Sequence, residues 1–127
     1  METIGAVLTR VEPGIVEVAL PYRADLTQQH GFLHAGIVAT ILDSACGYAA
    51  FSLMAANVAV LTVEYKINLL RPAQGDRFAA RAHVVRAGQT LTVCSADAFA
   101  QTGAAEKLIA TMLATVFAAP ERDDLKQ

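Results

Sequence analysis

The sequence predicts an α+β fold in which one long helix is wrapped by a twisted antiparallel sheet of about five to six strands. A proline-free, alanine-rich run over residues 34–54 predicts the helix. Short β-prone segments flank this run and are separated by turn signals. Because no second long helix is predicted, the strands are expected to bury their apolar side against this one.

The predicted strands form a hairpin before the helix and four further segments after it. In the hairpin, residues 3–11 and 15–20 flank the turn signal Glu12-Pro13-Gly14. A polar loop over residues 21–33 then leads into the helix. The strand-like segments after the helix are separated by glycine-containing turns and cover residues 58–70, 76–86, 90–100 and 108–117.

The strand at residues 58–70 alternates regularly between apolar and polar side chains. The apolar set runs over every second residue from Ala59 to Leu69, and Thr62 belongs to the other, polar set. We therefore expect the apolar set to pack on the helix and Thr62 to lie on the wetter face. An open edge strand is a liability, so sheets are expected to join between subunits.

Length and composition bound the possible functions. A chain of 127 residues is the size of one domain, expected over residues 1–118 with a tail at 119–127. With 54% hydrophobic and only 17% charged residues, part of the apolar surface is expected to meet another subunit. The net charge of −2 gives no electrostatic basis for binding nucleic acid or an anionic membrane.

Neither a membrane segment nor a metal site is expected from the sequence. The longest apolar stretch, residues 35–42, is much shorter than the roughly 20 residues of a membrane span, and no signal peptide is evident. Cys46 and Cys94 lie far apart without a CxxC or histidine-rich pattern, so they are expected to be free buried thiols. We expect a cytoplasmic protein with no cofactor.

Asp43 is the residue that fits its helix least. A carboxylate within an apolar helix is costly unless it is paired or hydrogen-bonded, and aspartate is a poor residue for a helix interior. Projection at about 100° per residue places small residues on the Asp43 side and bulkier ones, including Tyr48, on the opposite side, which should pack on the sheet. Asp43 is therefore a candidate base or nucleophile, an exposed surface residue, or a structural hydrogen-bond acceptor.

The predicted start of the helix carries a second set of candidates. His34 lies nine residues before Asp43, which is half a turn out of phase, so one straight helix cannot aim both at one atom. In a two-fold dimer, the helix start of one subunit can meet Asp43 of the other. The free N–H groups of Ala35 and Gly36 could hold a carbonyl oxygen. Alternatively, His34 caps or packs locally.

Three motifs follow one another along the chain: GFLHAG at residues 31–36 with LDSACG at 42–47, then TVEYKINLLRPAQGD at 62–76, and VVRAGQTL at 84–91. In this order they resemble the PaaI-type, phenylacetate-pathway branch of the hotdog thioesterase superfamily. The similarity covers roughly residues 26–117, which is most of the chain.

The resemblance implies a hotdog fold, a dimer with a continuous sheet that often pairs into tetramers, and acyl-CoA thioester hydrolysis between subunits. It makes Asp43 the catalytic carboxylate, as nucleophile or as general base. Ala35 stands where the family usually has the glycine whose N–H meets the thioester carbonyl. Gln28 stands where a water-orienting asparagine is common. Thr62 matches the serine or threonine that assists the carboxylate or the water.

Coenzyme A carries several negative charges, so basic residues are expected near its binding site. Candidates for substrate binding are Arg71, Arg86 and Lys66, together with Gly88 of the third motif. Ordinary solvated surface charge is the alternative for each of the basic residues.

Two other functions stay open at this stage. Hydratases and dehydratases of the same fold carry a histidine with prolines nearby, whereas no proline occurs between Leu26 and Leu70. Hydration of a crotonyl-type substrate would identify that class. A non-catalytic acyl-CoA binding module does not require Asp43, and saturable binding without thiol release would identify it.

Overall fold

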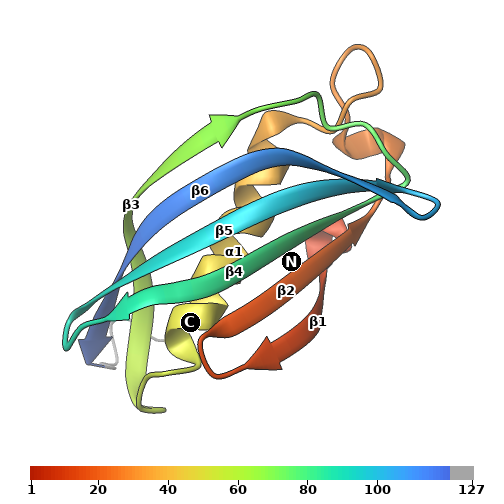
Figure 1. The fold of residues 1–127 in the computed structure, drawn as a ribbon. Coiled ribbons are helices and arrows are strands. Elements are labelled where there is room, and N and C mark those ends of the chain that lie inside the picture. Colours follow the sequence, from red (N-terminus) through yellow and green to blue (C-terminus); the bar gives the residue numbers. More distant parts are fainter. Residues whose placement is uncertain (121–127) are drawn as a thin grey trace.

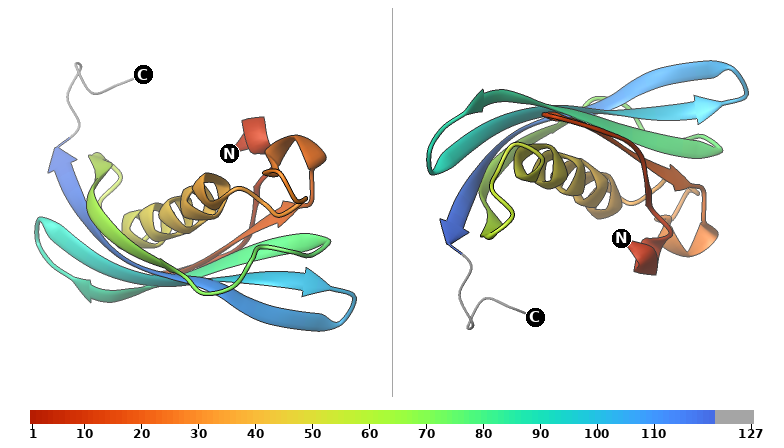
Figure 2. Two further views of the ribbon diagram at one scale, coloured as in Figure 1. Left: turned by 90° about the horizontal axis from the view of Figure 1, so that it is seen from above. Right: turned by 90° about the horizontal axis from the view of Figure 1, so that it is seen from below.

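The computed structural model describes residues 1–120, which form one antiparallel six-stranded sheet curved around a single α-helix (Figures 1 and 2). This is the predicted hotdog fold. The strand order is β1-β2-β4-β5-β6-β3, which leaves β1 and β3 at the two edges. The elements are β1 (Val7–Glu12), β2 (Ile15–Pro21), α1 (Ala35–Phe51), β3 (Val58–Leu69), β4 (Arg77–Ala87), β5 (Leu91–Thr102) and β6 (Ala105–Pro120).

The element boundaries differ from the predicted ones mainly at the ends of the chain. Residues 2–4 form a short 3-10 turn, so β1 begins at Val7 and not at residue 3. β6 begins at Ala105 and continues to Pro120, because every residue from Ala110 to Pro120 pairs with a residue of β3. Ala119 and Pro120 therefore belong to the sheet, and the rest of the predicted tail lies outside the described residues.

The helix α1 buries the side that faces the concave surface of the sheet (Figure 2). Val38, Ile41 and Ala45 pack there as predicted, but Tyr48 remains 43% exposed. The buried side chains are centred near Leu42 and Ala49, about a quarter turn away from the side opposite Asp43. Asp43 and Tyr48 consequently flank the buried side of α1, one on each margin. None of the helices in residues 1–120 has the length and apolar character that crossing a bilayer would need.

A β-bulge in the edge strand β3 overturns the predicted alternation. The register with β6 shifts between Thr62 and Glu64, so Val63 is an extra residue. Before the bulge, Thr62 pairs with the buried Val116 and faces α1; after it, Tyr65 pairs with the buried Ala114 and faces α1 as well. The prediction that Thr62 lies on the polar face is therefore wrong.

The same bulge leaves part of the predicted apolar set in solvent. Leu61 and Val63 are 47% and 58% exposed, although both were expected to pack on the helix. Tyr65 and Leu69 point to the concave side but are still 44% and 56% exposed, since no further strand within residues 1–120 covers that edge. β3 thus presents an apolar margin with free backbone groups along one side.

Candidate active site

A hydrogen bond between α1 and β3 holds the Asp43 carboxylate. The Thr62 hydroxyl donates to Asp43 Oδ1 over 2.8 Å. The bulge makes this contact possible, because it turns Thr62 toward the helix while the second half of β3, after the bulge, keeps its apolar side inward. Within residues 1–120, neither an ion pair to Asp43 nor a hydrogen bond to its Oδ2 atom is present. The half-buried carboxylate therefore has one anchored oxygen and one available oxygen.

Asp43 opens onto a cavity of about 340 Å³ between α1 and the first half of β3. Within residues 1–120, Asp43 is the charged side chain of the lining; the other lining residues are Ser44, Gly47, Tyr48, Phe51, Val60 and Thr62. Sequence reasoning selected Asp43 and Thr62 but missed Phe51. Phe51 follows Asp43 by eight residues, or just over two helical turns, and this spacing could have identified it.

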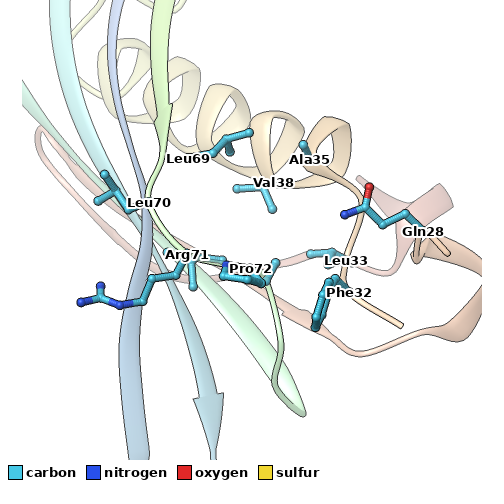
Figure 3. Close-up of a pocket in the computed structure, with 11 residues that line it drawn as sticks. Gln28, Phe32, Leu33, Ala35, Val38, Leu69, Leu70, Arg71 and Pro72 are labelled. Carbon is cyan, nitrogen blue, oxygen red and sulfur yellow. The ribbon is translucent and has the colours of Figure 1, made fainter. Parts of the chain in front are cut away.

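A second cavity, of about 350 Å³, lies at the N-terminus of α1 (Figure 3). It is mostly apolar, and Gln28 and Ala35 contribute to its wall beside the start of the helix. Its lining comprises Gln28, Phe32, Leu33, Ala35, Val38, Leu69, Leu70, Arg71, Pro72, Ala73 and Ile109. This cavity shares no residue with the one beside Asp43.

His34 caps the helix, as in the local alternative considered above. Its Nδ1 atom accepts a hydrogen bond of 2.9 Å from the Gly36 N–H, which fixes the proton of a neutral imidazole on Nε2. The Gly36 N–H is therefore occupied. Among the described residues the Ala35 N–H has no hydrogen-bond acceptor, so of the two predicted donors it is the one available to a ligand.

The cap gives a stability prediction. Replacing His34 by alanine removes the acceptor for the Gly36 N–H and should lower the free energy of unfolding by about 1 kcal/mol. Asparagine is a preferred cap, so His34→Asn should retain wild-type stability. Urea unfolding of both variants measures this difference. Equal loss in both variants would show that the imidazole stabilises the protein in some way other than capping.

Within one chain, the structure keeps the predicted catalytic residues in two groups, one beside Asp43 and one at the helix start. Asp43 and Thr62 line one cavity. At the helix start, Gln28 and Ala35 line the second cavity, whereas His34 and Gly36 line a third, of about 250 Å³. Ala35 and Asp43 are eight residues apart, which separates them by about 12 Å along the helix axis. One thioester carbonyl cannot contact both groups in the same chain.

The predicted substrate-binding residues are also dispersed. Arg71 follows β3, donates to the Leu108 carbonyl over 2.7 Å, and directs its guanidinium away from the other labelled residues in Figure 3. Lys66 pairs with Leu113 on the convex face of the sheet, away from both cavities. Arg86 and Gly88 lie at the β4–β5 hairpin, at a different end of the sheet from Arg71 (Figure 1).

The geometry of the β4–β5 turn explains why residue 88 is glycine. A Cβ atom at this position would lie 2.3 Å from the Leu91 carbonyl oxygen, which also accepts the Gly88 N–H over 2.9 Å. Only glycine fits this close turn. Among residues 1–120, no three His, Cys, Asp or Glu side chains gather in a way that could hold a metal ion.

Comparisons with known proteins agree with this fold. A protein of Halobacterium salinarum, which its name assigns provisionally to the esterases, is 38% identical over 97 residues that cover 71% of this chain and 62% of that protein. A protein of Saccharolobus solfataricus with a similar name is 36% identical over 83 residues, covering 65% of this chain and 59% of that protein. The chain thus spans less than two thirds of the length of these curated relatives.

Solved structures extend the similarity over nearly the whole chain. A thioesterase family protein from Silicibacter pomeroyi is 60% identical, with a TM-score of 0.93 over 94% of this chain and 88% of that one. A variant of the phenylacetic acid degradation protein PaaI from Thermus thermophilus is 26% identical, with a TM-score of 0.81 over 92% of this chain and 96% of that one.

A family model decides the assignment. Residues 30–107 match the model described as the thioesterase superfamily, and this segment includes α1, β3 and β4 with both Asp43 and Thr62. The chain therefore belongs to the thioesterase superfamily.

Proposed function

We propose that this protein is a PaaI-type acyl-CoA thioesterase that hydrolyses aryl or medium-chain acyl-CoA to the free acid and coenzyme A. The observation that carries the proposal is the Asp43 carboxylate, which Thr62 holds by one oxygen while the other is available at the wall of a cavity. A carboxylate placed in this way can activate water or attack a thioester.

Pairing of β3 with β3 of a second copy would complete the site. An antiparallel pair centred on the bulge sets the first half of one β3 against the second half of the other. Val60 lines the Asp43 cavity, and Leu69 lines the cavity at the helix N-terminus. A two-fold axis near Val63 thus brings Asp43 of one subunit toward Ala35 and Gln28 of its partner. Tetramers would follow if two such dimers associate.

In the composite site, each residue has one role. The Ala35 N–H donates to the thioester carbonyl oxygen and stabilises the negative charge that develops there. Asp43 of the other subunit takes a proton from water as the water oxygen bonds to the carbonyl carbon, or it attacks that carbon itself. When water is the nucleophile, the C–S bond then breaks and coenzyme A leaves as its thiol with the proton that Asp43 took up. When Asp43 attacks, the C–S bond breaks to leave an anhydride, and water cleaves this anhydride to the free acid, restores the carboxylate and supplies the proton of the thiol. Gln28 orients the water, and Thr62 keeps Asp43 in place.

Basic residues would bind the phosphates of coenzyme A outside the two cavities. Arg71 lies at the mouth of the helix N-terminal cavity, and Arg86 with Gly88 lies at the β4–β5 hairpin. Because the site is built from two chains, residues dispersed in one subunit can converge on one ligand. Lys66, on the convex face, is the weakest of these candidates.

A panel of acyl-CoA esters with a thiol-trapping reagent tests the proposed function. We expect thiol release that saturates with phenylacetyl-CoA and hexanoyl-CoA. The protein's own thiols should not interfere, since burial raises the pKa of Cys46 to about 12 and that of Cys94 to about 11, and only the thiolate reacts. Hydration of crotonyl-CoA without thiol release would indicate a hydratase, and saturable binding without reaction a binding module. Either result would reject the proposal.

A further inference from the structure

The cavity beside Asp43 extends along the helix and has a bare backbone as part of its wall. Gly47 lies one turn after Asp43, and a Cβ atom added there would meet no neighbouring atom within 4 Å. Glycine is the least favourable residue after proline in a helix interior, and alanine at this position would stabilise α1. The helix therefore carries a destabilising residue at a point where a side chain would project into open space beside the carboxylate.

Aromatic side chains stand at the far end of this cavity. Phe51 lies one further turn beyond Gly47, about 12 Å along the helix axis from Asp43, and is 40% exposed. Tyr48 is 43% exposed beside it, although tyrosine and phenylalanine usually bury most of their apolar area. The cavity thus leads from a carboxylate, over a bare backbone, to an apolar end.

The charge of the lining restricts what can occupy this cavity. Among residues 1–120, no cationic side chain lines the cavity, and Asp43 is its one anion. A second carboxylate at the end of an acyl chain would lie unpaired there, which is costly in an apolar environment. The phosphates of coenzyme A cannot be accommodated there either, so they must lie on the opposite side of the thioester.

We propose that this cavity binds the acyl group of the substrate and that Gly47 determines how bulky a neutral, apolar acyl group the enzyme accepts. The proposal rests on the thioesterase function above. With the thioester carbon at Asp43, the acyl group passes over Gly47 and contacts Phe51. A flat ring such as that of phenylacetyl-CoA fits the space that the missing side chain leaves, whereas a chain that ends in a carboxylate, as in succinyl-CoA, is disfavoured.

Side chains of graded size at Gly47 test this role against the stability of the helix. Gly47→Ala should raise the midpoint of thermal unfolding by about 4 °C. The same variant should lower kcat/KM for phenylacetyl-CoA about tenfold, and Gly47→Leu should lower it about 100-fold. Acetyl-CoA ends before Gly47 and serves as the internal control, with kcat/KM expected within about threefold of wild type.

The main rival is that Gly47 is small because a partner subunit packs against it. Light scattering after gel filtration separates the two roles. If Gly47→Leu dissociates the oligomer and both substrates lose activity equally, Gly47 is a packing residue and the proposal is wrong. An unchanged ratio of the two kcat/KM values in a folded, assembled variant also overturns it.

A binding measurement keeps this proposal separate from the proposed reaction. In an Asp43→Asn background, calorimetry with phenylacetyl-CoA and acetyl-CoA should show that Gly47→Leu weakens binding of the first about tenfold more than the second. This result in a protein whose wild type releases no thiol would support the acyl pocket and reject the thioesterase. Equal weakening of both ligands, with thiol release intact in the wild type, would reject the acyl pocket and support the thioesterase.

Discussion

Replacement of Asp43 by asparagine is expected to lower kcat for acyl-CoA hydrolysis by about 10²–10⁴-fold, the range typical of a lost general base. The amide has the shape of the carboxylate, and its oxygen can still accept the hydrogen bond from Thr62. It can neither take a proton from water nor attack a thioester. The fold and the oligomer should therefore be unchanged, as circular dichroism and light scattering would show.

Asp97→Asn is the matched control for this variant. Asp97 lies on β5 opposite Thr111, on the convex face and away from both cavities, so the same change of charge there should leave kcat within about twofold. If Asp43→Asn retains more than about a tenth of wild-type turnover, the catalytic assignment fails. If it loses activity because it no longer folds, Asp43 is a structural acceptor instead.

Replacement of Ala35 by proline is expected to lower kcat by about 10²–10³-fold through the loss of a single backbone N–H. Proline is tolerated at the first position of a helix, where the N–H has no intrahelical acceptor. The preceding residue must be extended, and His34 already is, with φ −61° and ψ 138°. The substitution therefore deletes a donor without a requirement to break α1.

Ala35→Gly is the control for the proline variant, because it keeps the N–H and removes only the methyl group. We expect it to hydrolyse acyl-CoA at least as well as the wild type. Activity measurements beside thermal unfolding curves distinguish the two variants. Full activity in a folded Ala35→Pro protein would exclude this N–H from the site, and the carbonyl would then need another donor.

The two inactive variants together provide a test of the shared site. A mixed dimer of Asp43→Asn and Ala35→Pro subunits has one site in which both substitutions fall and one in which neither does. After unfolding and refolding as a mixture, about a quarter of wild-type activity should return. If the mixture stays inactive although mass spectrometry shows mixed dimers, the two groups do not act across a subunit interface.

The fold was predictable because the elements differ clearly in pattern. One alanine-rich run without proline can only be a helix, and glycine-containing turns mark the hairpins that make the sheet antiparallel. The rotation of α1 was not predictable. The sequence shows that Asp43 leaves the core, but packing of α1 against the sheet decides which margin Asp43 occupies, and Tyr48 consequently stays exposed.

The candidate site was predictable in its residue types and not in its contacts. The sequence identifies Asp43 because a carboxylate in an apolar helix is energetically costly unless it is paired or hydrogen-bonded. Its contact with Thr62 depends on a bulge, which no local pattern marks, since Val63 continues the alternation of β3 without interruption. The cap at His34 likewise depends on a side-chain rotamer, so the sequence could not decide between Gly36 and Ala35 as donors.

The extra residue at Val63 has a consequence for how this chain can change. The two halves of β3 are out of phase by one residue, and each half has its own inward side chains, Thr62 in the first and Tyr65 in the second. Substitutions on the convex face leave this phase intact, but loss or gain of one amino acid between them would turn one half outward. The strand can therefore tolerate substitutions on its convex face but not a change in its length. Single-residue deletions near Val63 should abolish folding, whereas substitutions on the convex face there should not.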